Sequence, residues 1–559
     1  MVSPDTSHGL NRKLSPFRRT CSITSPQFLC RPMVRSSFSL NRPAGLEPQI
    51  QNQNAMKTNT RIIPCSTGNA AIHNRRNTHL SFFLVAAFLW LGLGSSGIAG
   101  SSPTQNAPET PSTTKNQPSW LSKANRHEKA GWVYVHIEGA PRERGYQYGY
   151  LLAKEIEQGI KATRADWEYQ SATKWSWLLK KSAAMFKGKI DKENLAELDG
   201  IVEGMQAAGV PSSRDEIIVY NAYFELIWYW WPEQLKKIKD GSMKLNHQAC
   251  SAFIATGSMT ADGGVVLGHN TMGNYWQTLP MIIIDIVPAK GHRILMQTYP
   301  GLIHSGTDFF ITDAGLVGAE TTIYPFEGFD PKGIPEFSRM RRAMQDAGSI
   351  DEWCAIMKRG NNGGYANAWL LGDVNTHEIA RLELGLKYVG FEKKRDGYFI
   401  GSNVAEDSKI LRFESDAHDT DIRGSEVARR VRWKQLMSEN GGKINAEAGK
   451  KFEADHFDVY LGEEHPGERT LCGHWELENK PIQQWPTEPN EPFGTLDGKV
   501  VDSTMAKQMS FAARWGSACG TAFDARKFLA AHPQYEWMRD ILQSRPSEPW
   551  AIFTAGEQH

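Results

Sequence analysis

The sequence lacks most of the short motifs that identify an enzyme directly. Its seven cysteines form no Cys-x-x-Cys, and there is no His-Glu-x-x-His, so no segment has the usual spacing of a zinc site. A Gly-x-Ser-x-Gly nucleophile elbow is also absent, which leaves a serine hydrolase with little support. The 63 Lys and Arg nearly balance the 62 Asp and Glu, so overall charge does not indicate a nucleic-acid partner. We expect no metal, no cofactor and no bound nucleic acid.

The N-terminal region lacks the long apolar run that a membrane-spanning helix requires. Residues 1–79 are basic, with Asp5 and Glu47 as their only acids, and we expect a disordered extension there. Residues 80–99 begin with an apolar run at 80–93, which is shorter than the roughly 20 residues that span a bilayer. Basic residues precede this run and small residues follow it, which predicts a signal peptide and export to the periplasm or the medium. The alternative is a membrane anchor formed by residues 80–93.

The remaining chain divides into a helical part and a part rich in strands. Residues 100–125 are rich in Ser, Thr, Pro and Asn and predict a flexible linker. Residues 126–249 show mainly helical spacing after one short strand pattern. From residue 250 onward, two series of apolar strands alternate with helical blocks. Two such series covered by helices are typical of a layered α+β fold.

The stretch from Ala249 to Asn270 predicts a β-hairpin. Apolar strands flank Asp262-Gly263-Gly264, and Asp-Gly between apolar runs is a strong hairpin signal. A hairpin brings the start of its first strand beside the end of its second, so Cys250 should lie close to His269 and Asn270. A thiol, an imidazole and an amide that meet at a strand end indicate a catalytic centre, although a cysteine that begins a buried strand is more often inert core. Composition alone leaves both interpretations open.

The other cysteines of the exported chain have simpler interpretations. Cys354 lies on the apolar face of a predicted helix, which favours a place in the core. Cys472 and Cys519 both lie in loop-like sequence. Because export permits disulfides, we expect these two cysteines to be paired.

A dense aromatic cluster, Leu226–Trp231, ends the helical part. The interpretation that we favour for this cluster is packed core. The alternative is one wall of an acyl-chain pocket beside Cys250, because ligand pockets are mainly apolar with few polar groups. Tyr275 and Trp276 are further candidates for the walls of that pocket.

Seven segments share an order along the chain that points to one family. They are Cys250–Ala252, Gly268–Thr271, Thr298–Gly301, Thr307–Phe310, Gly315–Ile323, Gly364–Trp369 and Leu496–Val500. Together they resemble the phospholipase B-like family of N-terminal-nucleophile (Ntn) hydrolases, relatives of penicillin acyltransferase and choloylglycine hydrolase. The resemblance covers about residue 126 to the C-terminus. The bile-salt branch has an Arg at the position of His269 and an Asp shortly after it, which this chain lacks, so the phospholipase B-like branch fits better.

The resemblance implies a fold and a maturation step. The fold is an αββα four-layer sandwich of two antiparallel sheets. The chain is expected to cut itself between Ala249 and Cys250, so that residues 250–559 become the catalytic chain and residues 126–249 its partner. The freed α-amine, with a reference pKa of roughly 8, then serves as the base for the thiol of Cys250.

The other site residues follow from the same resemblance. His269 and Asn270 are expected to orient the amine or the substrate. Asn367 is expected to donate to the oxyanion, and Thr321 to line the pocket beside it. The expected activity is cleavage of an acyl amide or acyl ester, through a thioester, in a small lipid or N-acyl amide, with transient contact to a membrane surface allowed. The alternative is a non-catalytic binding protein that retains the Ntn fold.

Overall fold

The computed structural model describes residues 117–237, 249–278, 281–480 and 488–558, all within one compact unit, Asn106–His559. The predicted extension (1–79) and signal segment (80–99) lie outside the described residues. The predicted linker, residues 100–125, extends too far, because helix α1 (Gln117–Leu121) and the first residue of strand β1 fall within it. Trp120 is tied to the fold, since its carbonyl accepts a hydrogen bond of 3.0 Å from Gln147 Nε2. No helix in the described ranges is both long and apolar enough to cross a membrane.

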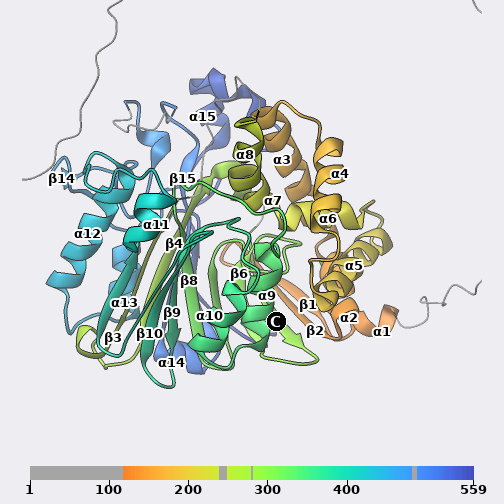
Figure 1. The fold of residues 1–559 in the computed structure, drawn as a ribbon, viewed down its shortest axis with the longest axis horizontal. Coiled ribbons are helices and arrows are strands. Elements are labelled where there is room, and N and C mark those ends of the chain that lie inside the picture. The colour runs from red at the N-terminus through yellow and green to blue at the C-terminus, as the bar shows by residue number, and fades with distance from the viewer. Residues whose placement is uncertain (1–116, 238–248, 279–280, 481–487, 559) are drawn as a thin grey trace, which may run out of the picture. The chain divides into compact units, whose positions relative to one another are not determined.

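Two β-sheets form the centre of this unit (Figure 1). The nine-stranded sheet runs in the order β1 (Asn125–Lys129), β2 (Trp132–Gly139), β5 (Ile282–Pro288), β6 (Ile294–Thr298), β7 (Phe309–Thr312), β8 (Leu316–Thr322), β9 (Asn367–Asp373), β10 (Glu378–Leu384) and β11 (Val389–Lys394). The six-stranded sheet runs in the order β12 (Gly397–Gly401), β3 (Ala249–Thr256), β4 (Val266–Asn274), β15 (Phe493–Asp502), β16 (Ser510–Trp515) and β17 (Ala551–Thr554). A small separate pair joins β13 (Phe457–Asp458) to β14 (Glu463–Glu464).

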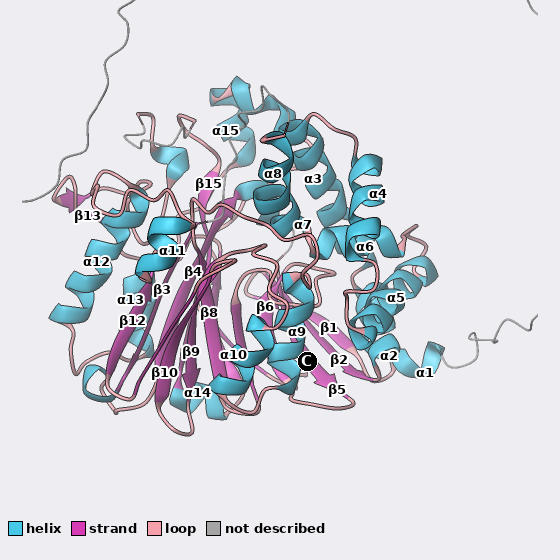
Figure 2. Ribbon diagram, viewed as in Figure 1, coloured by secondary structure: helices cyan, strands magenta, loops and turns pink. Residues whose placement is uncertain are grey.

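The two large sheets stack face to face and are covered by helices on both outer faces (Figure 2). Strands β3 and β4 contact β8 of the other sheet, and β3 also contacts β9. Helices α12 (Ser425–Glu439) and α13 (Ala446–Glu453) pack on the six-stranded sheet, while α9 (Glu336–Asp346) and α10 (Ile350–Lys358) pack on the nine-stranded sheet. The expected αββα sandwich is confirmed. One strand pair departs from purely antiparallel sheets, because β2 and β5 run parallel.

The remaining helices are short or belong to the N-terminal part. They are α2 (Pro141–Leu151), α3 (Ala153–Ser171), α4 (Trp175–Phe186), α5 (Lys192–Ala207), α6 (Arg214–Asn221), α7 (Tyr223–Glu225), α8 (Trp231–Leu235), α11 (Ser408–Phe413), α14 (Ser503–Lys507) and α15 (Ala525–Ala531). A π-helical turn, Leu226–Trp230, joins α7 to α8. The N-terminal part is thus mainly helical in its described residues, yet β1 and β2 are built into the nine-stranded sheet.

Alternation along β3 determines which side chains face the second sheet. Ala252 and Ile254 belong to the core between the sheets, whereas Phe253 and Ala255 belong to a separate apolar cluster against α12 and α13. Phe253 packs there against Trp433, with ring centroids 5.2 Å apart. Because side chains on a strand alternate, Cys250 lies on the inner face with Ala252 and Ile254.

Helices α2 and α5 pack so closely that glycine is needed at their contact. A Cβ at Gly145 would lie 2.1 Å from Glu197 O, and a Cβ at Gly149 would lie 2.1 Å from Ile201 O. Any larger side chain at these two positions would push the helices apart. The Gly145-x-x-x-Gly149 spacing in the sequence therefore reflects helix packing rather than a ligand site.

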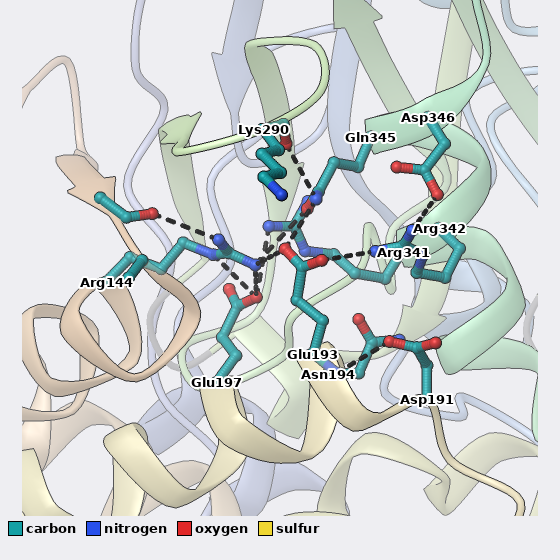
Figure 3. Close-up of polar contacts among 12 residues, drawn as sticks. Arg144, Asp191, Glu193, Asn194, Glu197, Lys290, Arg341, Arg342, Gln345 and Asp346 are labelled. Atoms are coloured by element: carbon teal, nitrogen blue, oxygen red, sulfur yellow. Dashed lines mark hydrogen bonds and ion pairs between the residues drawn. The ribbon is translucent and has the colours of Figure 1, made fainter.

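A buried ion-pair network lies beside this contact and joins α2 and α5 to α9 (Figure 3). Glu197 Oε2 accepts from Arg144 Nη2 at 2.7 Å and from Arg341 Nη2 at 3.3 Å, and all three side chains are fully buried. Glu193 extends the network to Arg342 (2.8 Å). Since α9 follows Cys250 in the chain and α2 and α5 precede it, the network links the two parts that the expected cleavage would separate.

Candidate active site

The predicted hairpin is confirmed as β3 and β4, and its register decides which side chains meet. Its opposed pairs are Cys250 with Thr271, Ser251 with Asn270, and Ala252 with His269. Opposed residues of an antiparallel pair point to the same side of the sheet. Cys250, His269 and Thr271 therefore share the inner face, and Asn270 points to the outer face.

Cys250 is fully buried between the sheets and faces two carboxyl groups. Its Sγ and one carboxylate oxygen each from Asp308 and Glu320 lie within 4.8 Å of one another. Burial, with a smaller contribution from the charge of Asp308, raises the pKa of the Cys250 thiol to about 12. Burial and the neighbouring Asp308 likewise hold the pKa of Glu320 well above its usual range. The Cys250 thiol therefore retains its proton at neutral pH in the intact chain, and the surroundings of Glu320 favour its protonated form.

Two polar side chains hold the backbone of Cys250. Asn403 Oδ1 accepts a hydrogen bond of 3.0 Å from Cys250 N, and Arg429 Nη1 donates one of 2.5 Å to Cys250 O. Arg429 Nη2 also donates to Asn403 Oδ1 at 2.9 Å, so the two side chains support each other. Asn403 is fixed further because its Nδ2 donates to Thr322 O at 2.7 Å. No sequence pattern indicated either residue, since Asn403 follows an ordinary strand and Arg429 lies in a helix rich in basic residues.

His269 lies diagonally across the hairpin from Cys250, but no hydrogen bond joins the two side chains. Its Nε2 lies 2.8 Å from Glu320 O. A carbonyl oxygen can only accept, so this nitrogen carries the hydrogen and Nδ1 has the free lone pair. Burial lowers the pKa of His269 well below its usual value, so the ring is neutral. Nδ1 is buried and has no hydrogen-bond partner among the described residues.

The role expected for Asn270 does not fit its position. Its Nδ2 donates to Glu453 O at 2.6 Å and to Leu471 O at 3.0 Å, on the face of the sheet that α13 covers. The hairpin register turns Asn270 away from Cys250, so it cannot orient the amine of Cys250 or a substrate beside it. Asn270 instead ties β4 to the segments that cover the outer face.

Asn367 and Thr321 lie on adjacent strands of the opposite sheet. Asn367 begins β9 and pairs with Thr322 of β8, one residue beyond Thr321. Its amide is fully buried, and neither of its polar atoms has a hydrogen-bond partner among the described residues. Thr321 lies against Gly401, where a Cβ would be 2.5 Å from Thr321 Oγ1. Gly401 pairs in turn with Ala252, so Thr321 faces the strand of the nucleophile across the sheet interface.

A buried Asp–Lys pair completes the inner face. In the register of β15 with β4, Asp497 lies opposite Thr271 and Lys499 lies opposite His269. Lys499 Nζ donates to Thr271 Oγ1 at 2.6 Å and also forms an ion pair with Asp497. Both residues occur in the segment Leu496–Val500 that supports the family resemblance, yet the sequence alone suggested no role for them.

The aromatic candidates divide between a cavity and the core. Trp276 lines a small cavity of about 30 Å³, together with Tyr220, Tyr223, Phe224, Tyr299 and Leu302. Tyr275 does not line this cavity but packs under the Arg545 guanidinium, 3.6 Å from the ring centroid. Trp228–Trp231 are buried in the main core, as the interpretation that we favoured predicts. Tyr299, which also lines the cavity, is affected by the charges of the centre: burial, followed by the charges of Asp497, Asp308 and Cys250, holds the pKa of its phenol well above its usual value.

Comparison with known proteins finds similarity to one family in the region that holds this site. The Phospholipase B family model matches residues 142–390, which include Cys250, His269, Asp308, Glu320 and Asn367. Phospholipase B-like protein C of Dictyostelium discoideum is 31% identical over 224 residues, which cover 35% of this chain and 38% of that protein. Phospholipase B of Crotalus adamanteus is 24% identical over 289 residues, which cover 47% of this chain and 50% of that protein.

The chain matches half or less of the length of these two relatives. Among solved structures, a mutant of the conjugated bile acid hydrolase from Clostridium perfringens is a distant neighbour. It has a TM-score of 0.31 and 10% identity, and the match covers 47% of this chain and 89% of that chain. The family model and the sequence relatives show that this chain is similar to the phospholipase B-like family.

Proposed function

We propose that the chain is a cysteine hydrolase of the N-terminal-nucleophile type. In this proposal it cuts its own backbone between Ala249 and Cys250 and then cleaves acyl amides or acyl esters through a thioester at Cys250. The observation that carries the proposal is the hydrogen bonding of the Cys250 backbone. Asn403 accepts from its nitrogen, and Arg429 donates to its carbonyl oxygen. Any buried backbone needs such partners, but here both are side chains, and Asn403 is placed to hold the amine that cleavage would free.

Self-cleavage starts from the neutral thiol. Sγ of Cys250 attacks the carbonyl carbon of Ala249, and the peptide C–N bond breaks as its nitrogen gains a proton and becomes the free amine of Cys250. Water then hydrolyses the thioester, which releases the Ala249 carboxylate and restores the thiol. Asp308 and Glu320 lie within 4.8 Å of Sγ, and Asp308, with a pKa of about 7, is the group available to take and return the proton. Burial raises the pKa of both carboxyls, so each can carry a proton near neutral pH.

After cleavage, the nitrogen that donates to Asn403 becomes an α-amine. A free α-amine has a reference pKa of roughly 8, which suits a general base near neutral pH. Asn403 Oδ1 can still accept one of its hydrogens, leaving the nitrogen lone pair for the thiol proton. Arg429 donates a hydrogen bond to Asn403 Oδ1 and another to the carbonyl oxygen of Cys250. We therefore assign Asn403 and Arg429 as positioning residues of the nucleophile.

The buried polar atoms without partners are the candidates for contacts with the reacting acyl group. Asn367 Nδ2 is a donor that nothing in the described chain satisfies, and buried donors are rarely left so. We assign it to the oxyanion, where one preorganised donor contributes about 3 kcal/mol. His269 Nδ1 is the corresponding acceptor, and we assign it to the substrate or to the protonated amine. Thr321 remains a pocket neighbour in this proposal.

The cavity lined by Trp276 and Tyr299 supports an acyl substrate. Its lining is mainly aromatic and aliphatic, which suits an apolar acyl chain. Two of the relatives are named for phospholipase B, which favours an acyl ester of a lipid. A thioester mechanism also permits an N-acyl amide. The apolar segment at residues 80–93 favours export of the enzyme.

The test is mass analysis of the purified, denatured chain. We expect two chains, the second beginning at Cys250. Cys250→Ala should remain a single chain and Cys250→Ser should be cut more slowly, because the hydroxyl is the weaker nucleophile. Cys354→Ser is the control, since Cys354 is also buried but lies on α10, and it should be cut like the parent.

The outcome also separates the enzyme from its alternative. The processed form should hydrolyse at least one member of a panel of lysophospholipids, N-acyl amides and β-lactams. A chain that stays intact at acidic and at neutral pH, and hydrolyses none of them, would overturn the proposal. Tight binding of an acyl compound by such an intact chain would support a non-catalytic binding protein that retains the fold.

A further inference from the structure

A second group of reactive side chains lies outside the Cys250 centre. It consists of two cysteines and two histidines, and one ligand atom from each lies within 4.8 Å of the others. The members of this cluster, which we call the Cys/His cluster, are His456, Cys472, His474 and Cys519. They come from three separate segments: the connection after α13, the segment before β15, and the loop after β16. Folding, not local sequence spacing, brings them together.

The predicted disulfide between Cys472 and Cys519 is not formed in the structure. Both are free cysteines, and His474 lies beside both of them. His474 Nε2 is 3.5 Å from Cys472 Sγ and 3.4 Å from Cys519 Sγ. A disulfide would require the two sulfurs to approach to about 2.05 Å. The two thiols thus share an imidazole rather than a covalent bond.

We propose that the Cys/His cluster is a structural site for zinc, or for another divalent ion that prefers tetrahedral sulfur and nitrogen ligands. Two thiolates and two imidazoles are a common donor set for tetrahedral zinc. With bonds of about 2.1 Å to nitrogen and about 2.3 Å to sulfur, a nitrogen–sulfur edge of the tetrahedron is about 3.6 Å long. The two observed edges, 3.5 Å and 3.4 Å, match this value. Four protein ligands leave no open position, which indicates a structural rather than a catalytic ion.

The surroundings of the cluster support the same assignment. His474 Nδ1 lies 2.9 Å from Glu476 Oε1, and a carboxylate on the other ring nitrogen is the usual support of a metal-binding histidine. Thr521 N donates to Cys519 Sγ at 3.4 Å, which stabilises a thiolate. His456 Nε2 is buried and has no hydrogen-bond partner in the described part of the chain.

The ion would fix the cover of the six-stranded sheet. Cys472 follows Leu471, whose carbonyl accepts from Asn270 of β4, and Cys472 N donates to Asp455 O, next to His456. Binding displaces one proton from each thiol and closes these three segments around one ion. The bound ion would also hold in place the segment around Leu471, whose carbonyl accepts a hydrogen bond from Asn270.

The test is metal content of the full-length chain, purified without chelators. We expect about one zinc per chain, lost in Cys519→Ser and in His456→Ala. Cys354→Ser and His465→Ala are the matched controls and should keep it, since neither residue belongs to the cluster. Glu476→Gln should weaken zinc binding about 10- to 100-fold, as expected for a supporting carboxylate. Zinc retained by both cluster variants would overturn the proposal.

A second measurement does not depend on variants that fold. Cobalt(II) titrated into the chelator-treated, reduced parent chain should give the strong ligand-field bands of a tetrahedral site, with thiolate-to-cobalt charge transfer. Peptide mapping without reductant should show Cys472 and Cys519 as separate thiols. A Cys472–Cys519 disulfide in the purified chain, or no cobalt spectrum, would contradict a metal site.

Discussion

Two fully buried glutamates, Glu197 and Glu320, show how differently this protein treats the same side chain. Burial alone would raise the pKa of either carboxyl. At Glu197, Arg144 and Arg341 outweigh burial and hold the pKa below its usual value. At Glu320, burial is reinforced by Asp308 and Cys250, and the pKa lies well above the usual range. Opposite charges are paired in the Arg144–Glu197–Arg341 network, whereas groups of the same sign meet at Cys250.

This difference indicates that the network around Glu197 stabilises the fold, whereas the acidic groups around Cys250 are suited to proton transfer. A buried ion pair is costly to break, because removing one partner leaves an uncompensated charge. A cluster of like groups in a low dielectric stores protons that can be transferred, and such clusters are enriched at functional sites. Both regions hold buried polar atoms without a partner among the described residues: Glu197 Oε1 and Arg341 Nε in the network, and His269 Nδ1 and both polar atoms of Asn367 at the site. The two regions therefore differ in how their charges are paired rather than in whether every polar atom is satisfied.

The largest effect that we expect in this comparison is on stability at the network. Glu197→Gln should lower the free energy of unfolding by about 3–5 kcal/mol, because two buried guanidinium groups lose their shared carboxylate. The matched variant Glu320→Gln should change it by less than about 1 kcal/mol, since a neutral carboxyl is replaced by a neutral amide. Urea unfolding of both variants at pH 7 makes the comparison. Equal losses would remove the distinction between the two glutamates.

A somewhat smaller effect is expected on turnover at Asn367. Asn367→Leu should lower kcat about 10²- to 10³-fold through loss of the oxyanion donor, with little loss of stability because no hydrogen bond is broken. The control is Asn194→Leu, which breaks the hydrogen bonds of 3.1 Å and 2.9 Å that Asn194 Nδ2 donates to Ser338. That variant should lose about 1–3 kcal/mol of stability and keep its kcat. Steady-state kinetics and thermal unfolding of both variants are the measurements.

The smallest expected effect is a pH dependence near the site. Burial raises the pKa of Glu336 to about 8, so the folded state holds this proton more tightly than the unfolded state. Its stabilising contribution is complete below pH 4.5 and is lost as pH rises through about 8. Glu336→Gln lacks this titration, so between pH 5 and pH 8 it should gain about 1–3 kcal/mol relative to the parent.

Unfolding of parent and variant across this pH range measures the difference directly. Burial lowers the pKa of His269 and of His304 in the folded state, so both gain protons on unfolding in parent and variant alike and their contributions cancel. Glu197→Gln should behave in the opposite way. The network holds the pKa of Glu197 below 4.5, so that variant's deficit should shrink only at acidic pH. A constant difference for Glu336→Gln from pH 5 to pH 8 would contradict the assigned pKa.

Local patterns predicted the strands and the hairpin, because apolar alternation and Asp-Gly turns depend on neighbouring residues; the αββα sandwich was implied by the family resemblance instead. They could not predict the hairpin register. The connection between β3 and β4 is longer than a two-residue turn and includes a 3₁₀ turn at Gly257–Met259, so counting residues does not fix which partners oppose. A shift of one residue reverses the face of every side chain, which is why Asn270 was assigned to the wrong side.

The site partners of Cys250 were hidden for a different reason. Asn403 contacts Cys250 from 153 residues away, and Arg429 reaches it from a helix on the outer layer. Stacking of two sheets, not any local motif, brings Asp308 and Glu320 to the thiol. The same holds for the Cys/His cluster, whose members fit no known metal-binding spacing although their ligand atoms converge within 4.8 Å.

The parallel pairing of β2 with β5 has a consequence for how the protein folds and for whether it can refold after unfolding. Strand β2 belongs to the part before Cys250 and β5 to the part after it, and β5 in turn pairs with β6. While the chain is continuous, joining these strands is an intramolecular step. Once the bond before Cys250 is cut, the same sheet would have to be rebuilt from two molecules. The mature protein would then be assembled only once, and its lifetime would depend on the rate of unfolding rather than on an equilibrium.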